Sequence, residues 1–439
     1  MNLDQKIAAL ATQLEPMTIE RRRDLHRHPE PGWTEFRTAS LVIETLQKAG
    51  YEVRFGADVV AENAMMGVPA PDILEEAAHR AIAQGADPAL VKKMAGGKTG
   101  VVGTLRFKKP GPVVALRFDM DCNEVTEAAE DKHRPFREGF RSEHDGCMHA
   151  CGHDGHTATG LAIAEILASL KDELAGTVKF IFQPAEEGVR GAKAMVASGV
   201  ADDVDYMLGA HLMMPPTGYL AYDVQGFLAT SKFDVFFQGV PAHAGASPEV
   251  GKNSLLAAAN AAINLQAISR HGAGISRINV GVLKAGSGRN VIASDAMLQV
   301  ETRGETSEIN QYIFSQAENI IQGCALMYDN KYSIRHMGNA VSGFNSQELS
   351  EKIGSIARRL GTFSRYEALR SIGGSEDYSY FMEAVQKKGG QAAYLIIGAS
   401  LTAVNHNLYF DFDEHALTLE AQLLATAASE LLLEALPNT

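Results

Sequence analysis

Apolar runs and helix-like repeats alternate along much of the chain. Short, almost continuous apolar runs predict buried strands, and stretches with helical periodicity lie between them. The runs fall at residues 113–118, 177–182 and 205–211, and the helical stretches at residues 38–49, 73–83 and 157–170. Because strands that alternate with helices form parallel sheets, this pattern predicts an α/β domain with a largely parallel sheet.

The pattern changes in the middle of the chain. Strand, helix, strand, strand, helix and strand follow one another between residues 225 and 337. This β-α-β-β-α-β order is the ferredoxin-like unit. The earlier pattern then resumes and ends in a long apolar helix at residues 418–433. The sequence therefore predicts a discontinuous domain, residues 1–224 and 338–439, interrupted by an inserted domain at residues 225–337.

Length and charge narrow the class of protein. A chain of 439 residues exceeds the usual size of one hydrophobic core, which agrees with two domains. Its net charge of −13 disfavours nucleic-acid binding, because phosphate backbones are also negative. The first residues do not resemble a secretory signal, and no apolar run is long enough to cross a bilayer. We therefore expect a cytoplasmic protein without a membrane partner, in which these cysteines stay reduced: Cys122, Cys147, Cys151 and Cys324.

One short segment gathers residues that bind metals. Cys151 and His153 lie two residues apart across a glycine, which permits a tight loop that brings a thiolate and an imidazole to one ion. His149 and His156 are further candidates, and Asp154 could hold an imidazole by a hydrogen bond. The alternative is a polar loop without metal. It is disfavoured because one cysteine and three histidines fall within eight residues of a chain that has only 14 histidines.

Two glutamates and two further histidines follow predicted strands. Glu186 and Glu187 come after a buried strand and a proline, where one carboxylate can bind a metal while the other takes a proton from water. His211 ends another strand, and His406 follows a strand at residues 394–398. Each has an ordinary alternative, since glutamates at helix starts are commonly solvated and lone histidines are commonly structural. A role in the metal site is nevertheless favoured for these residues, because one loop supplies too few ligands for a metal centre. Ligands also collect at the carboxyl ends of parallel strands.

The inserted domain carries polar groups in glycine-containing segments. His243 lies in the segment 242–245, and Asn290 in the segment 286–291. The second segment lacks the glycine spacing and the lysine of a phosphate-binding P-loop, so we reject that interpretation. Arg303 ends a predicted strand and could bind a carboxylate with two hydrogen bonds, although an exposed strand-end arginine explains it equally well.

Taken together, these segments resemble the M20 metallopeptidase family, and within it the amidohydrolase branch that includes auxin-conjugate and hippurate hydrolases. The matching segments cover most of the chain in the expected order: residues 119–121, 149–156, 182–188, 209–211, 242–245, 286–292 and 374–377. The resemblance implies a zinc-peptidase-like catalytic domain and an inserted ferredoxin-like domain that serves as lid and dimerisation surface. It also implies two divalent metal ions per subunit, manganese or zinc, with Cys151 as the bridging ligand beside His153, Glu187, His211 and His406.

The resemblance further implies roles for residues outside this ligand set. Glu186 would act as the general base and later as the acid, and His243 would reach a partner subunit's site and stabilise the oxyanion. Asn290 and Arg303 would hold the free carboxylate of the substrate. The implied partner is a second copy of the chain or a homologous second subunit, joined through the inserted domain.

Three segments refine the expected substrate. Residues 57–98, 134–140 and 411–413 resemble members of the branch that cleave p-aminobenzoyl-glutamate to p-aminobenzoate and glutamate. Other N-acyl amino acids, such as hippurate or N-acetyl amino acids, are the alternative substrates. Many relatives have proline at the position of Ala293 and Ala-Leu at the position of Cys122-Asn123, and these departures concern substrate identity more than the reaction.

Two other classes of function compete with this interpretation. A non-catalytic partner subunit of a heteromeric hydrolase is disfavoured by the complete ligand set. A cysteine hydrolase that uses Cys151 with His153 is disfavoured because residues so close in one loop rarely form a nucleophile–base pair.

Overall fold

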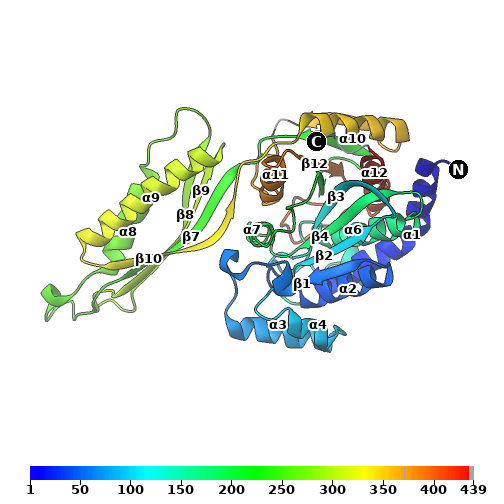
Figure 1. Ribbon diagram of the computed structural model, residues 1–439. Helices are drawn as coiled ribbons and strands as arrows, with labels where there is room; N and C mark the ends of the chain where they lie inside the picture. The colour runs from blue at the N-terminus through cyan, green and yellow to red at the C-terminus, as the bar shows by residue number, and fades with distance from the viewer. Residues whose placement is uncertain (370, 435–439) are drawn as a thin grey trace. The chain divides into compact units, whose positions relative to one another are not determined.

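The chain forms two compact units, each described by itself. The computed structural model describes residues 1–369 and 371–434 (Figure 1). The first unit comprises residues 1–225, residues 344–372 and the chain from residue 377 onward, and the second comprises residues 226–343 and 373–376. In the part of the chain that the structure describes, no helix has the length and apolar character needed to cross a membrane.

The first unit contains one large sheet and the helices around it. Its helices are α1 (Leu3–Arg27), α2 (Phe36–Lys48), α3 (Pro71–Ala83), α4 (Pro88–Lys93), α5 (Arg134–Arg137), α6 (His153–Ser169), α7 (Ala192–Ala197), α10 (Gln347–Leu360), α11 (Ser379–Gln386) and α12 (His415–Leu432). Its strands are β1 (Glu52–Phe55), β2 (Val101–Arg106), β3 (Lys109–Asp119), β4 (Ala175–Gln183), β5 (Tyr206–Met213), β6 (Tyr219–Val224), β11 (Arg365–Leu369) and β12 (Gln391–Gly398). Short 3-10 turns lie at Gly56–Asp58 and Glu62–Ala64.

The strands form an eight-stranded sheet in the order β1-β2-β4-β3-β5-β12-β6-β11. The four central strands, β4, β3, β5 and β12, are parallel to one another, and antiparallel pairs occur on both sides of them. The predicted α/β class with a mostly parallel sheet is therefore confirmed. Because the central strands are parallel, their carboxyl ends share one edge, and this edge is where ligands gather in such sheets.

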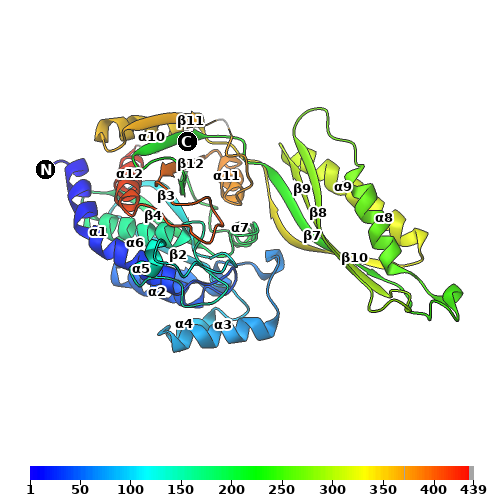
Figure 2. The same cartoon turned by 180° about the vertical axis from the view of Figure 1, so that it is seen from behind.

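Strand β3 shows how the sheet separates two helical layers. Phe118 packs against α6, where a side chain in place of Gly160 would collide with its ring. Its neighbour Arg117 points to the opposite face, since adjacent residues of a strand alternate, and there it forms an ion pair with Asp377, two residues before α11. Helices α1, α6 and α12 contact one another, and Figure 2 shows them side by side. The sheet is thus covered by helices on both faces, as a parallel sheet requires.

Helix α6 begins four residues before the predicted start at residue 157. Gly152 precedes the helix in the left-handed conformation, with φ 92°, and His153 is its first residue. The first turn contains buried histidine and aspartate instead of apolar residues, so hydrophobic periodicity could not reveal it. As a result, the Cys-His loop continues directly into a helix that is anchored in the core.

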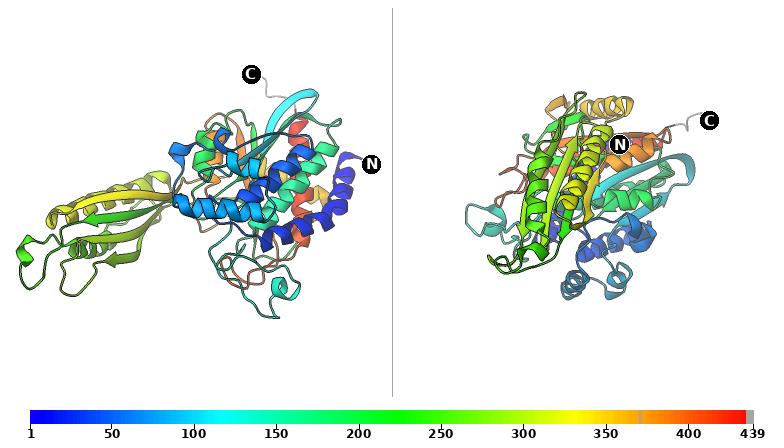
Figure 3. Two further views of the ribbon diagram at one scale, coloured as in Figure 1. Left: turned by 90° about the horizontal axis from the view of Figure 1, so that it is seen from below. Right: turned by 90° about the vertical axis from the view of Figure 1, so that its left-hand side faces the viewer.

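The second unit is a four-stranded antiparallel sheet with two helices. Its elements are β7 (Ala229–Gln238), a 3-10 turn (Pro248–Val250), α8 (Ser254–Gln266), β8 (Ser276–Ala285), β9 (Asp295–Gly304), α9 (Ser307–Met327) and β10 (Lys331–Ala340). The strand order is β10-β7-β9-β8, and α8 and α9 cover one face of the sheet (Figure 3). The β-α-β-β-α-β order is as predicted. The compact unit runs to Gly343, beyond the predicted boundary at residue 337, because β10 continues to Ala340.

Candidate metal centre

The loop before α6 brings Cys151 to the carboxyl edge of the sheet. Its Sγ lies 3.4 Å from Nε2 of His211 in β5. Asn405, in the loop after β12, donates a hydrogen bond from Nδ2 to the same sulfur over 3.2 Å. The sulfur therefore contacts polar groups from two segments that are far in the sequence from its own loop and from each other.

His153 and His211 each have one ring nitrogen fixed by the backbone. His153 Nδ1 lies 2.9 Å from the carbonyl oxygen of Asp121, and His211 Nδ1 lies 2.8 Å from that of Leu212. A carbonyl oxygen accepts only, so both Nδ1 atoms donate, and in the neutral ring Nε2 carries the free lone pair. His153 Nε2 is buried and has no hydrogen-bond partner among the residues that the structure describes. Metal-binding histidines are commonly oriented in this way.

The turn after β4 presents the two glutamates. The Asp121 carboxylate accepts hydrogen bonds from the backbone N–H groups of Glu186 and Glu187, over 3.0 and 2.9 Å. The turn also requires positive φ at Ala185, 51°. The buried carboxylate of Glu35 holds this strained residue by accepting a hydrogen bond from its N–H over 2.7 Å. Sequence patterns did not reveal Glu35, because nothing local links it to a turn 150 residues later.

His406 reaches the site from the loop after β12. Its backbone has a φ of 65°, and its N–H donates to the carbonyl of Ala150 over 2.7 Å. Its Nε2 lies 3.2 Å from Oε1 of Glu187. The side chain is half-exposed, whereas Cys151 and His153 are buried. The site therefore has a closed inner side and a more open side at His406.

These side chains fall into ligand groups that share one sulfur. Cys151, His153 and His211 form one group, and Cys151, Glu187 and His406 form a second. Within each group the ligand atoms lie within 4.8 Å of one another. Thiolate, imidazole and carboxylate suit borderline divalent metals. The buried His153 Nε2 without a partner fits this interpretation, because a buried polar atom is normally satisfied.

The charges in the site also suit metal binding. Burial opposes ionisation of Cys151, but the charge of His211 and hydrogen bonds from His153 and His211 together outweigh it and lower the thiol pKa to about 6. Burial likewise opposes ionisation of Glu187, yet hydrogen bonding to His406 lowers the pKa of its carboxyl to about 2. Contact with Cys151 and Glu187 raises the pKa of His406 to about 10. Protons on the histidines thus balance a thiolate and a carboxylate, and a divalent cation would displace those protons.

Glu186 borders the ligand groups without belonging to the two that share Cys151. Its Oε2 lies 3.9 Å from His153 Nε2, and the side chain is almost buried. Glu186, Glu187 and His153 together form a third cluster of possible ligands. A carboxylate beside the ligands is placed to exchange protons with water at the same site.

The other candidates of the Cys-His segment have different partners. His156 uses both ring nitrogens, with Nδ1 2.6 Å from Asp119 Oδ1 and Nε2 accepting from the N–H of Leu212 over 3.1 Å. His149 is buried and belongs to neither group that shares Cys151; burial lowers the pKa of its imidazole to about 3. Asp154 does hold an imidazole, but it is that of His26 in α1, 2.8 Å away.

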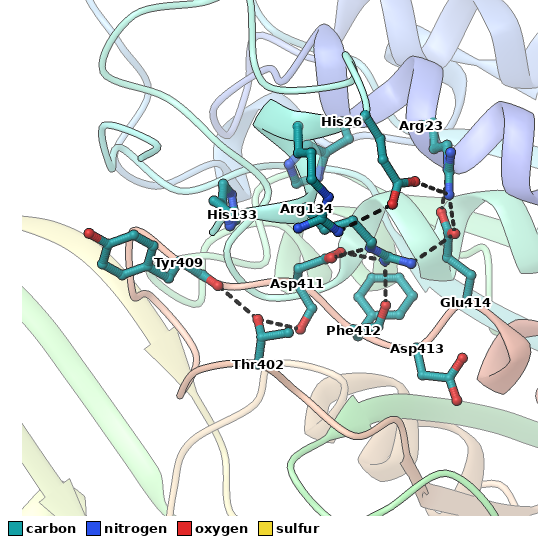
Figure 4. A network of polar contacts seen from close by, with 12 residues as sticks. Arg23, His26, His133, Arg134, Thr402, Tyr409, Asp411, Phe412, Asp413 and Glu414 are labelled. Carbon is teal, nitrogen blue, oxygen red and sulfur yellow. Dashed lines mark hydrogen bonds and ion pairs between the residues drawn. The ribbon is translucent and has the colours of Figure 1, made fainter. Parts of the chain in front are cut away.

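A buried ion network lies behind the metal-binding loop. Arg22 in α1 joins Asp154 over 2.8 Å and Asp411 over 2.9 Å. Arg134 binds Asp411 from the other side over 2.6 Å and also contacts Glu414 (Figure 4). The network ties α1 and the segment containing α5 to the loop after β12, which carries His406. The sequence did not show these ion pairs, because each arginine lies 132 to 389 residues from its partner.

A pocket of about 780 Å³ opens beside this network. One wall comes from residues 132–137 and includes Lys132 and Arg137. The other comes from the loop after β12, residues 400–413, and includes Asn407. Tyr409 lies on the same wall (Figure 4). Because Asn407 follows His406, the pocket and the candidate metal centre are built partly from one loop.

The remaining predicted site residues lie in the second unit. His243 and Asn290 occupy paired segments, where the N–H of Ala244 donates to the Asn290 carbonyl over 2.9 Å. His243 Nδ1 accepts hydrogen bonds from the N–H groups of Gly245 and Ala246. Arg303, near the end of β9, pairs with Glu301 over 3.0 Å. The structure thus brings His243 and Asn290 together, and the roles of all three residues stay predictions.

Comparison with known proteins gives a consistent result. Residues 115–430 match the profile of peptidase family M20/M25/M40. The chain is 48% identical to indole-3-acetyl-aspartic acid hydrolase of Enterobacter agglomerans, over 95% of this chain and 96% of that protein. It is 46% identical to one of the subunits of p-aminobenzoyl-glutamate hydrolase of Escherichia coli, over 97% of this chain and 98% of that protein. The crystal structure of an aminobenzoyl-glutamate utilization protein from Klebsiella pneumoniae superposes with a TM-score of 0.83 at 41% identity, and 98% of each chain is covered.

Proposed function

Because the chain belongs to peptidase family M20/M25/M40, we propose that it is a metal-dependent amidohydrolase that cleaves the amide bond of N-acyl amino acids. The observation that carries this proposal is the convergence of two ligand groups on Cys151, with Glu186 beside them. The proposed ligands of two divalent ions are Cys151, His153, Glu187, His211 and His406.

The side chains divide the work of hydrolysis. When bound, the divalent ions supply Lewis-acid chemistry that lowers the pKa of water and polarises the amide carbonyl. Glu186 accepts the proton of the attacking water and later delivers it to the leaving amine nitrogen. The Asp121 carboxylate accepts a hydrogen bond from the backbone N–H of Glu186. This bond fixes the backbone of the turn from which the proposed base extends. We further propose that His243 stabilises the oxyanion and that Asn290 and Arg303 bind the free carboxylate of the substrate.

The proposed substrate is an aromatic acyl group joined to an acidic amino acid. One relative is named for indole-3-acetyl-aspartic acid and another for p-aminobenzoyl-glutamate. The two compounds share an aromatic acyl group and a dicarboxylic amino acid. Of these we favour p-aminobenzoyl-glutamate, because the relative named for it and the similar crystal structure carry the same aminobenzoyl-glutamate name. Lys132 and Arg137, in the pocket beside the His406 loop, offer cations for such a side-chain carboxylate.

The metal and the assembly are proposed on separate grounds. A thiolate ligand favours zinc over ions that prefer oxygen, and manganese is the second candidate.

We propose a dimer formed through the second unit, because apolar side chains are exposed on its helices, including Ile263 at 71% and Leu326 at 81% exposure. A homologous second subunit is the alternative partner, since the Escherichia coli relative is named as one subunit of its hydrolase. We also propose a cytoplasmic location, which would keep the cysteines reduced.

A substrate panel tests the proposal. The purified, metal-loaded chain is assayed against p-aminobenzoyl-glutamate, indole-3-acetyl-aspartate, hippurate and N-acetyl amino acids. Release of the free amino acid is measured, and the two dicarboxylic conjugates should give the highest kcat/KM. Preference for hippurate would contradict the proposed substrate class. Absence of hydrolysis with the whole panel would instead favour a non-catalytic subunit.

A further inference from the structure

Asn405 contacts the sulfur of Cys151 but is not one of the proposed metal ligands. Its Nδ2 donates a hydrogen bond to the sulfur over 3.2 Å, and Cys151 is buried. A buried anion needs hydrogen-bond donors, because it has lost most of its contact with water. A thiolate accepts hydrogen bonds only, and within an amide only the nitrogen donates. The orientation of Asn405 therefore suits an ionised sulfur.

This hydrogen bond does not depend on a proton that a metal ion displaces. His211 Nε2 lies 3.4 Å from the same sulfur, but an imidazole that binds a metal through Nε2 no longer carries a proton on that atom. The amide of Asn405 is neutral and keeps both of its N–H groups. Asn405 therefore still has a donor for the sulfur when two metal ions share it.

A second hydrogen bond joins the same two segments of the chain. The N–H of His406 donates to the carbonyl of Ala150 over 2.7 Å, so the loop after β12 and the Cys-His loop share one backbone and one side-chain hydrogen bond. His406 is the third residue of a turn that the N–H of Asn407 closes on the carbonyl of Val404 over 3.2 Å, and its φ is 65°. Glycine or asparagine usually takes this conformation, so surrounding contacts must hold a histidine in it.

We propose that Asn405 is a positioning residue of the metal centre, which stabilises the shared Cys151 thiolate through its amide N–H and holds His406 beside it. The proposal rests on the proposed function, because it concerns the metal ions that this function requires. Hydrogen bonds to a thiolate withdraw electron density from the sulfur and so tune its bonds to a metal. Residues that hydrogen-bond metal ligands typically contribute about ten- to a hundredfold to metal affinity.

Competition for Zn²⁺ measures the contribution of Asn405 to metal affinity. The Zn²⁺-loaded protein is titrated with a chromophoric chelator, and Asn405→Leu removes the donor at similar side-chain volume. We expect this variant to bind Zn²⁺ about ten- to a hundredfold more weakly than wild type. Asn63→Leu is the matched control and should bind as wild type does, because Asn63 is exposed in the 3-10 turn Glu62–Ala64. Equal affinity of Asn405→Leu and wild type would overturn the role of Asn405 alone, whereas absence of Zn²⁺ binding by wild type would overturn the proposed metal centre itself.

The absorption spectrum of the Co²⁺-loaded protein separates a hydrogen bond to sulfur from a merely structural role. A thiolate bound to Co²⁺ gives a sulfur-to-metal charge-transfer band in the near ultraviolet, and loss of a hydrogen bond raises the energy of the sulfur electrons. We therefore expect this band at longer wavelength in Asn405→Leu than in wild type, and at the wild-type wavelength in Asn63→Leu. Asn405→Ala, which removes the donor without adding apolar bulk, should show the same shift as Asn405→Leu. A band at the wild-type wavelength in both Asn405 variants would overturn the proposed stabilisation of the thiolate, even with reduced affinity.

Discussion

The sulfur of Cys151 lies 3.4 Å from Nε2 of His211, which joins the loop before α6 to the end of β5. The same sulfur belongs to the group that contains Glu187 and His406. Cys151 is thus the residue common to two candidate ligand groups, and the remaining ligands divide between them. This division makes the proposed metal stoichiometry testable residue by residue.

Cys151→Ala should lose both metal ions, because the variant removes a ligand from each group. His211→Ala and His406→Ala should each retain about one ion per chain, since each removes a ligand from one group only. Metal content per chain is measured by mass spectrometry of the purified variants after dialysis, with Cys324→Ala as the control. Retention of two ions by Cys151→Ala would contradict its assignment as the bridging ligand.

His26 should make the stability of the protein depend on pH in the alkaline range. Burial disfavours its charge, but hydrogen bonds to Asp154 and Glu127 outweigh burial and raise the pKa of the imidazole to about 9. The protonated ring therefore contributes its full stabilisation below the unfolded pKa of about 6.5 and loses it as pH rises through about 9. The shift corresponds to on the order of 3 kcal/mol, since one pKa unit is worth about 1.4 kcal/mol.

Denaturant unfolding of the metal-loaded protein at pH 6 and pH 9.5 measures this effect. His26→Gln should be less stable than wild type at pH 6, and the difference should shrink at pH 9.5. His79→Gln serves as the control, because His79 is exposed on α3. An equal deficit of His26→Gln at both pH values would show that the charge of His26 contributes nothing.

The basic wall of the pocket beside α5 should select for an acidic substrate. Lys132 and Arg137 are exposed, and their ion pairs with Glu130 and Glu138 lie at the surface, where such pairs are weak and easily exchanged. The double variant Lys132→Ala/Arg137→Ala should raise KM about tenfold for p-aminobenzoyl-glutamate, because one charge-assisted hydrogen bond is worth about 1.5 kcal/mol. It should leave KM for p-aminobenzoyl-glutamine nearly unchanged. An equal rise in KM for both conjugates would show that the side-chain carboxylate of the substrate does not bind to Lys132 and Arg137.

The sequence allowed the architecture to be predicted, and it singled out the proposed ligands for a separate reason. The strands around Val114 and Val178 are buried on both faces, so they appear in the sequence as continuous apolar runs. The order of elements in the second unit followed from ordinary periodicity. Cys151, His153 and Glu187 stand out because their residue types suit metals and because they follow predicted strands or a glycine loop.

The supporting contacts could not be predicted in the same way. Glu35 holds Ala185 and Arg22 binds Asp411, and each pair is formed by chain segments that only the folded sheet brings together. Asp154 was expected to hold an imidazole, but the sequence did not show that the imidazole belongs to α1. Long-range polar pairing leaves no periodic signal, so local patterns cannot reveal it.

Glu186→Gln provides the most direct test of the central claim, which is that Glu186 moves the proton while other residues hold the metals. Metal content and turnover of p-aminobenzoyl-glutamate are measured on one preparation of this variant, beside Glu76→Gln as an exposed control on α3. We predict two metal ions per chain, as in wild type, and a kcat reduced by at least about a thousandfold, within the range that general acid–base groups supply. A variant that keeps both ions and a near-normal kcat would contradict the account.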